Sequence, residues 1–447
     1  MNIENFKSIV LINLIVISLF LTFNLWTYVP ETSSSSEAKY VQDNEEIGET
    51  EISDVIFPSS FIAKKDNKSN THLIVKDKEA IKVLYEVLKE GEFHHFREIG
   101  KEKQDFLSFV NDEDKIEFVF PTAVPFDSIR SGFNLKEKNL EGYSFNRILV
   151  DLAASTDDDI KTYFILDETK KIYEMTLTGV ALTQITNKLQ AILPKAERYS
   201  MYTLESGRFF LPNAPTTMKE IEYFISSQDP LTFKNVLFTD PRYVKEIKGE
   251  SENTYTDGTR LMKVLKENHM LQYTNSSVDD KRGLSGNILV QRSFDFINSH
   301  NGFPNDALND YRLDDMNAGE GEITFRRYKD NKPVFNSNGM SKLEQVWGTD
   351  LISYQRPLFK VTHDIHESSN VTLPRGNDVI ESLQKKPQIS LKRVKNIGIG
   401  YKLVPGSEAN DGKSIVTIRL IPIWYVVYGD AHQVFEWKEG GELVGLE

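Results

Sequence analysis

The segment Gly406–Ser414, with the sequence GSEANDGKS, contains the residue types of a phosphate-binding loop. In such a loop four residues separate the two glycines, and the first N–H groups of the following helix contact the phosphate. Here five residues separate Gly406 from Gly412, and the next residues, IVTIRLI, have the pattern of a strand. We therefore interpret the segment as the loop of a β-hairpin and not as a nucleotide site.

Ser382 and Lys385 have the Ser-x-x-Lys spacing of penicillin-recognising enzymes. On a helix this spacing places the lysine one turn from the serine, where the amine can accept the hydroxyl proton. The Ser-Asp-Asn and Lys-Thr-Gly segments that complete such sites occur nowhere in the chain. The pair is therefore interpreted as part of a solvated helix face.

Residues that could bind a metal occur in two places. His363 and His366 have i, i+3 spacing but no third histidine or cysteine nearby, so we interpret them as surface residues. The acidic segment Asp306–Glu322 suggests a calcium loop. An alignment that starts at Asp315 puts Gly319 at position 5, whereas the sharp turn of that loop needs glycine at position 6. We predict no metal site and no cofactor.

Composition excludes further classes of function. The chain has 447 residues, with 53 Lys and Arg against 66 Asp and Glu, and a formal net charge of −13. This charge disfavours contact with a phosphate backbone, so no nucleic-acid partner is expected. The absence of cysteine from an exported protein of this size favours a bacterium that makes little use of disulfides. Since no catalytic motif remains, the chain is predicted not to be an enzyme.

The elements that would position these residues begin with an apolar leader. From Ile9 to Trp26 no residue is charged, which approaches the roughly 20 apolar residues that a helix needs to cross a bilayer. We predict a cytoplasmic N-terminus over residues 1–8 and a single transmembrane helix over residues 9–28. Lys7 precedes this span and the next basic residue is Lys39. The positive-inside rule therefore predicts a single-pass protein of the cell membrane whose bulk is extracytoplasmic.

A second interpretation of the leader stays open. A cleaved signal peptide needs small residues after its apolar run, and Ser33–Ser36 could supply them, although the residues directly after Trp26 are bulky. Residues 29–54 are rich in Ser, Glu and Asp and are predicted to be a disordered tether. Its polar part would reach roughly 25–30 Å, which holds the folded region close to the membrane.

Residues 55–200 are predicted to form an N-terminal α+β domain. THLIVK has the pattern of a strand, and a helix is expected from Asp77, as its cap, to Glu90. A β-hairpin is expected to turn at Asp167–Lys170. A second helix is predicted over residues 182–192, where apolar residues recur at helical spacing.

The rest of the chain is divided into a middle α+β domain, residues 201–291, and a β-rich C-terminal domain, residues 292–447. In the middle domain the segment Arg260–Leu271, RLMKVLKENHML, is predicted to be helical. In the last domain, paired strand patterns such as GEITFRRY and KPVF, joined by KDN, predict β-hairpins. Helices that alternate with hairpins are typical of α+β architecture.

Aromatic-rich segments recur along the chain. They are SFDFINSHNGFPND, GEITFRRYKDNKPVFN, EQVWG, SYQRPLF, NIGIGYKL and LIPIWYVVYGD, together with LTFNLWTY in the predicted span and SFNRILVD in the first domain. These segments resemble the YycH (WalH) family of Gram-positive bacteria, over essentially the full length of the chain. The resemblance implies one transmembrane helix and a multi-domain extracytoplasmic region of antiparallel sheets with packed helices, whose C-terminal part is YycI-like.

The resemblance also implies a function. A family member regulates the sensor histidine kinase WalK (YycG) together with a second single-span protein, YycI, in a two-component system that governs cell-wall metabolism. A homodimer or a heterodimer fits this role. The resemblance implies no catalytic residues for this chain, and it does not imply whether the chain activates or inhibits the kinase. The alternative is an exported sensor that binds a ligand or wall fragment without direct kinase contact. A deep pocket with convergent polar groups would favour that alternative.

Asn13, Asn24 and Trp26 are the candidate partner-binding residues of the predicted span. The two asparagines are 11 residues apart, so at about 100° per residue they share one helix face. An asparagine within lipid is costly unless a neighbouring helix supplies a hydrogen bond, which contributes about 0.6–2 kcal/mol. Asn13 is deep enough to contact a kinase helix or is simply a tolerated polar residue. Asn24 and Trp26 are expected at the outer membrane interface.

Overall fold

The computed structural model describes Leu14, Ser18 and residues 50–447, apart from short stretches in that range. These stretches are residues 65–69, 101–102, 205–206, 279–282, 301, 305, 309, 366–368, 407–415 and 430. Apart from Leu14 and Ser18, the predicted span therefore lies outside the described residues, as does most of the predicted tether. Within the described part of the chain, no helix is long and apolar enough to cross a membrane. The helices and strands from residue 52 onward belong to one compact unit, Ile47–Glu447.

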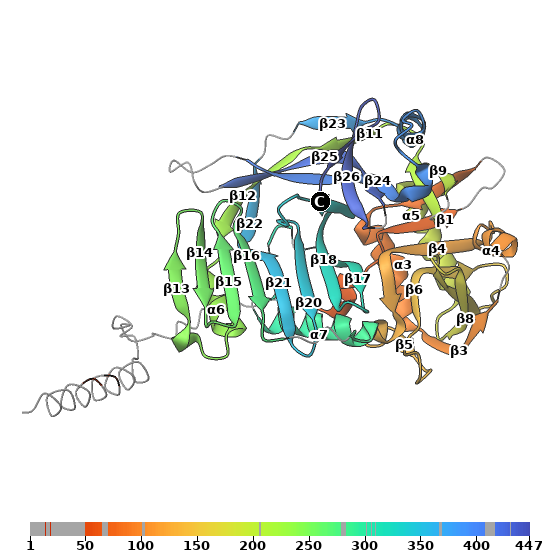
Figure 1. Ribbon diagram of the computed structural model, residues 1–447. Coiled ribbons are helices and arrows are strands. Elements are labelled where there is room, and N and C mark those ends of the chain that lie inside the picture. The colour runs from red at the N-terminus through yellow and green to blue at the C-terminus, as the bar shows by residue number, and fades with distance from the viewer. Residues whose placement is uncertain are drawn as a thin grey trace, which may run out of the picture. The chain divides into compact units, whose positions relative to one another are not determined.

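A ten-stranded sheet carries the N-terminal part of this unit (Figure 1). Neighbouring strands are antiparallel, except that β3 and β5 are parallel. In spatial order the strands are β10 (Gly207–Pro212), β9 (Glu197–Leu204), β2 (Thr71–Val75), β1 (Ser60–Lys64), β4 (Lys115–Pro125), β6 (Ser144–Asp151), β7 (Ile160–Leu166), β8 (Lys171–Thr178), β3 (Glu92–Ile99) and β5 (Asn134–Leu135). The predicted hairpin is confirmed as β7 and β8.

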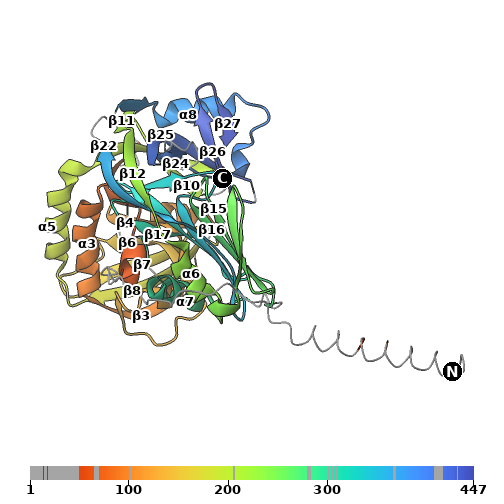
Figure 2. The same cartoon turned by 90° about the vertical axis from the view of Figure 1, so that its left-hand side faces the viewer.

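Helices α3 (Lys78–Glu90) and α5 (Leu182–Ile192) lie side by side on this sheet (Figure 2). The predicted cap of α3 is confirmed, because the Asp77 carboxylate accepts a hydrogen bond from the Ala80 N–H at 2.8 Å. The other helices are α2 (Ile52–Val55), α4 (Lys103–Val110), α6 (Pro230–Leu237), α7 (Gly286–Ser299), α8 (Gly376–Gln384) and the 3-10 turns η1 (Phe126–Ile129), η2 (Leu193–Lys195), η3 (Pro241–Tyr243) and η4 (Leu391–Arg393).

A second, 15-stranded sheet carries the rest of the chain. Its main path is β13 (Lys245–Lys248), β14 (Glu252–Thr256), β15 (Arg260–Leu265), β16 (Met270–Asn275), β21 (Leu351–Pro357), β20 (Lys342–Trp347), β18 (Glu322–Lys329), β19 (Lys332–Phe335), β24 (Val394–Pro405), β25 (Thr417–Tyr428), β12 (Ile221–Ser227) and β22 (Phe359–Ile365). Strand β17 (Tyr311–Asn317) pairs with β18, and β26 (Gln433–Lys438) joins β25 to β27 (Glu442–Gly445). Strands β11 (Thr216–Lys219) and β23 (Asn370–Leu373) pair separately. The hairpins predicted after residue 292 are confirmed.

The predicted helix over residues 260–271 is wrong, because this segment forms the hairpin of β15 and β16. Met262 pairs with Tyr255 on one side and with Tyr273 on the other, and Tyr273 pairs with Tyr354 of β21. All four side chains are buried. A short apolar run fits both helical and strand periods, and the cross-strand contacts of this buried row decide in favour of the strand.

The sheets cross the predicted domain limits. The limit between residues 200 and 201 falls inside β9, and β10 extends the first sheet beyond it. Strands β12 to β16 of the predicted middle domain join the same sheet as the strands after residue 292. At the other end, the last residues of the predicted tether, 52–54, belong to α2, and Ile52 is buried. That residues 55–200, 201–291 and 292–447 fold as separate domains remains a prediction.

Candidate functional site

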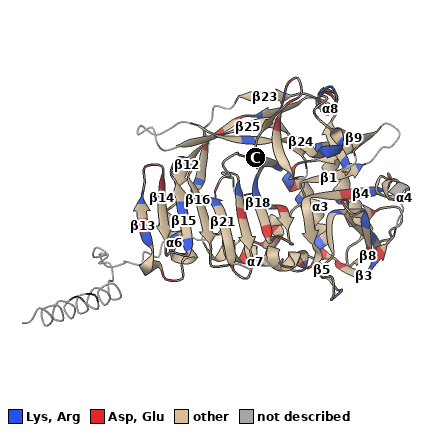
Figure 3. Cartoon of the chain, in the orientation of Figure 1, with Lys and Arg blue, Asp and Glu red and all other residues tan. Residues whose placement is uncertain are grey.

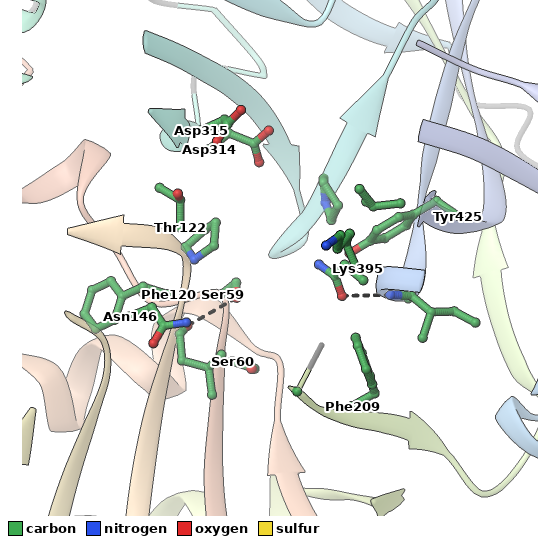
Figure 4. A pocket seen from close by; sticks show the side chains of 18 of the residues that line it. Ser59, Ser60, Phe120, Thr122, Asn146, Phe209, Asp314, Asp315, Lys395 and Tyr425 are labelled. Atoms are coloured by element: carbon green, nitrogen blue, oxygen red, sulfur yellow. Dashed lines mark hydrogen bonds between the residues drawn. The ribbon is translucent and has the colours of Figure 1, made fainter. Parts of the chain in front are cut away.

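A cleft of about 1710 Å³ lies between the two sheets. Residues of β1, β2, β4, β9 and β10 line one wall, and residues of β17, β18, β24 and β25 line the other. Figure 4 shows Ser59 and Phe120 on the first wall, and Lys395 and Tyr425 across the cleft from them. A concave site of this size, with polar groups from several elements, is the usual location of a bound ligand.

Arg312 of β17 fixes the two walls to each other by hydrogen bonds. Its Nε and Nη2 atoms donate to the two carboxylate oxygens of Asp310 at 3.1 and 2.7 Å. Its Nη1 donates to the Pro58 carbonyl at 3.2 Å and also to the Asn331 side chain, which in turn donates to the Ser59 carbonyl at 2.7 Å. Although burial opposes ionisation, the charge of Arg312 holds the pKa of Asp310 below its ordinary value.

Two aromatic rings enclose the Arg312 guanidinium. Its central carbon lies 5.0 Å from the centroid of the Phe57 ring and 4.6 Å from that of the Tyr328 ring. The residue is fully buried, at 0 % exposure. A buried guanidinium that has a carboxylate, two main-chain or side-chain oxygens and two rings around it is fully satisfied. We call Arg312, Asp310, Asn331, Phe57 and Tyr328 the joint.

A second buried ionic cluster lies beside the cleft on β4, β6 and β10. The Glu117 carboxylate, which is 0 % exposed, accepts hydrogen bonds from Arg147 at 2.6 Å and from Arg208 at 2.9 Å. Arg208 also donates to Asn111 at 3.1 Å, and Arg147 pairs with Asp167. Burial disfavours the charge of Arg147, but the charges of Asp167 and Glu117 prevail and raise the pKa of Arg147.

Lys76 and Lys332 line the cleft without comparable partners. Burial, followed by the charge of Lys332, lowers the pKa of Lys76 to about 8. Burial also lowers the pKa of Lys332, against the opposing charges of Asp330 and Glu197. Burial therefore disfavours the charged form of both lysines.

On the opposite wall, the buried Arg326 is paired with carboxylates. Arg326 donates to Glu447 through two hydrogen bonds of 2.8 Å and to Asp314 at 2.6 Å. Next to this pair, burial and the charge of Asp314 raise the pKa of Asp315. Among the described residues, no group of three or more His, Cys, Asp or Glu could hold a metal ion. This wall therefore provides fixed charges and no metal centre among those residues.

The residues that resembled catalytic or metal motifs have structural contacts. The Ser382 hydroxyl accepts a hydrogen bond from the Trp437 indole at 2.8 Å and donates to the Val379 carbonyl at 2.7 Å. It is thus half-buried on α8 and not part of a solvated face, because the indole of β26 packs over it. His363 is exposed on β22, and His366 lies outside the described residues.

The acidic segment that suggested calcium forms ion pairs with buried arginines. Asp306 accepts two hydrogen bonds from Arg327, at 3.0 and 2.9 Å, and Asp314 pairs with Arg326. Asp306 and Asp314 of this segment therefore neutralise arginines of β18. Of the loop GSEANDGKS only Gly406 is described, and the flanking strands β24 and β25 pair as the predicted hairpin.

Asn13, Asn24 and Trp26 lie outside the described residues, so their predicted contacts stay predictions. The sequence interpretation missed Lys76, Lys332 and the joint. Lys76 ends the predicted strand THLIVK, and a lysine at the end of a strand is too common to mark a site. Only the pairing of strands from distant parts of the chain brings these residues together.

Two family models match the chain. The model described as "YycH protein, N-terminal domain" matches residues 4–194, and "YycH protein, C-terminal domain" matches residues 206–439. A curated relative, the "Two-component system WalR/WalK regulatory protein YycH" of Bacillus subtilis (strain 168), is 25% identical over 439 residues, which are 94% of either chain. The crystal structure of YycH from Bacillus subtilis superposes with a TM-score of 0.70 at 21% identity, covering 89% of this chain and 97% of that one. This likeness confirms the sheet-rich α+β fold.

Proposed function

Because the chain belongs to the YycH family, we propose that it is a membrane-anchored, extracytoplasmic regulator of the sensor histidine kinase WalK (YycG). The observation that supports this proposal most is that both family models match, in order, across nearly the whole chain. Membership in a family of two-component regulatory proteins also confirms the expectation that the chain is not an enzyme. The proposed output is control of cell-wall metabolism.

The proposed anchor is the apolar segment over residues 9–28. It would leave residues 1–8 in the cytoplasm and hold the sheet-rich unit on the outer side of the cell membrane. We propose that residues 292–447 resemble YycI and that a YycI-like single-span protein, or a second copy of this chain, pairs with the chain through them. A weak contact is sufficient, because a coupling free energy of about 1–3 kcal/mol changes a two-state equilibrium by 5- to 150-fold.

The test of the intramembrane contact is Asn13→Leu in the full chain. We expect crosslinking to the kinase span to fall, and kinase output to change by about 3- to 30-fold, the equivalent of one interhelical hydrogen bond of 0.6–2 kcal/mol. Asn24→Leu is the matched control, since a residue at the interface can contact water and should change both readouts less. Unchanged crosslinking and output with Asn13→Leu would remove the intramembrane contact.

The cleft favours a second candidate function, an exported sensor that binds a ligand without direct kinase contact. The specific observation is a cleft of about 1710 Å³ in which the arginines are paired with carboxylates, whereas burial disfavours the charge of Lys76. Co-purification from membranes separates the candidates. A direct regulator carries the kinase with it only when residues 9–28 are present, whereas a ligand sensor purifies without the kinase in both forms.

A further inference from the structure

The lysines of the cleft come from opposite sheets. Lys76 directly follows β2, and the side chain two residues before it, Ile74, lines the same cleft, as the alternation of a strand requires. Lys332 begins β19 after the two-residue turn Asp330–Asn331, where both residues have positive φ, 49° and 60°. Such a turn matches the twist of a tight hairpin.

The turn before Lys332 is attached to the strand that borders Lys76. The Asn331 amide donates to the Ser59 carbonyl at 2.7 Å, and Ser59 and Ser60 precede and begin β1, the neighbour of β2. Because the joint fixes this turn, the main chain at Lys332 is held beside the first sheet. Both lysines line the same cleft, and the charge of Lys332 acts on Lys76.

Neither ammonium group forms an ion pair with a described residue. Among the described residues, no carboxylate lies within 4.0 Å of the Lys76 amine, and the Lys332 amine donates to the Asp330 carbonyl at 3.2 Å. The charge of Glu197 acts on both lysines and that of Asp330 acts more strongly on Lys332, while the Glu197 carboxylate also accepts from the Tyr199 hydroxyl at 3.4 Å. An ammonium group has three donors, so each lysine keeps donors available for another molecule.

This local excess of positive charge contrasts with the rest of the chain. The chain as a whole is strongly acidic, and basic and acidic residues are mixed over both sheets (Figure 3). The buried arginines of the cleft, by contrast, have carboxylate partners, as Arg147 and Arg208 have in Glu117. Two interacting cations that line one cleft without such a partner raise the energy of the unliganded protein, and an anion bound to both would lower it.

We propose that Lys76 and Lys332 together bind an oxyanion, the carboxylate or phosphate group of a ligand that lies in the cleft. Both groups present two or more oxygens that can accept charge-assisted hydrogen bonds from both amines. The cleft is far larger than one anion, so the oxyanion is one end of a larger molecule. This inference rests on the second candidate function and is independent of control of the kinase through the span.

The experiment is equilibrium dialysis of the full-length chain in detergent micelles at pH 7, with radiolabelled inorganic phosphate in one arm and acetate in the other. We expect saturable binding of at least one probe. Lys76→Met and Lys332→Met are each expected to weaken it by about 10- to 100-fold, the effect of one charge-assisted hydrogen bond. Binding of phosphate alone identifies a phosphate ligand, and binding of acetate with similar affinity identifies a carboxylate.

The matched control is Lys342→Met. Lys342 also lines the cleft, but its amine already pairs with Glu344 at 2.8 Å, so binding should stay within about twofold of the wild type. Thermal melting of each variant verifies that it is folded. The proposal is overturned if neither probe saturates the wild type, or if folded Lys76→Met and Lys332→Met bind as the wild type does. Kinase output in the same variants is read separately, so a failure here leaves the regulatory proposal intact.

Discussion

The joint, with its fully buried Arg312, and the half-buried lysine pair are two cationic regions at the same cleft, and they differ in how their charges are satisfied. At the joint, Arg312 has a bidentate carboxylate, a carbonyl, an amide oxygen and two rings as neighbours. Lys76 has a neighbouring cation and a lowered pKa. The first arrangement holds the sheets together, whereas the second costs stability in the absence of another molecule.

This difference separates structural from functional charge. Groups that serve folding alone are expected to be paired, because an unpaired buried charge is costly. Groups that bind a ligand have to remain available, and the fold tolerates their cost. The cleft therefore has both a structural contact, the joint, and a pair of lysines that we propose bind a ligand.

The largest effect is expected from breaking the joint. Arg312→Met should lower the free energy of unfolding by about 3–5 kcal/mol, since Asp310 and the Asn331 oxygen lose a buried donor. Urea unfolding of the full chain measures this change. Arg242→Met is the matched control, because Arg242 also pairs with an aspartate two residues earlier, Asp240, but is 84% exposed. Its stability should equal that of the wild type, and equal losses in both variants would contradict the joint.

A smaller effect of opposite sign is expected at the lysine pair. Lys76→Met should raise the free energy of unfolding at pH 7 by about 1–3 kcal/mol, because the fold lowers the pKa of Lys76 from 10.5 to about 8. Below pH 8 both folded and unfolded chains carry this charge, so the gain is constant. Between pH 8 and 10.5 the folded wild type loses the proton first, its stability rises with pH, and the gain of the variant disappears.

Urea unfolding at pH 7 and pH 10.5 measures this dependence. Lys342→Met serves as the control, because a lysine paired with Glu344 should show no gain at pH 7. A loss of stability in Lys76→Met at pH 7 would show that the amine is satisfied by a contact that stabilises the fold, and would remove the contrast with Arg312.

The smallest effect is expected at Ser382. Ser382→Ala removes the acceptor of the Trp437 indole, and we expect a loss of about 1 kcal/mol in urea unfolding. Lys385→Ala, the other half of the Ser-x-x-Lys pattern, should leave stability unchanged, since this lysine is exposed. Equal losses in both variants would indicate that the pair acts as a unit, which the contacts of Ser382 do not suggest.

Sequence patterns predicted the elements whose determinants are local. The Asp77 cap, the Asp167–Lys170 turn and the hairpin around Asp330 each depend on a few adjacent residues, and all three are present. The segment 260–271 was assigned to the wrong element, because its partners Tyr255 and Tyr354 decide its conformation.

The cleft could not be predicted in the same way. Asn331 and Ser59, whose hydrogen bond attaches one wall to the other, are 272 positions apart. Lys76 and Lys332 are separated almost as far, and neither has a local pattern that distinguishes it from a surface lysine. The family resemblance supplied the fold and the regulatory class, but it contains no catalytic signature that could have indicated the cleft.

The claim that an anchored chain regulates the kinase is tested most directly by the phosphorylated fraction of WalR in the bacterium that makes this protein. Three strains are compared: one with the native chain, one without it, and one in which a cleavable signal peptide replaces residues 1–28. If the anchor holds the regulator beside the kinase, the strain with the secreted form has the phosphorylated fraction of the deletion strain, and both differ from the native strain. Equal phosphorylation in all three strains, or a native level with the secreted form, would contradict the account.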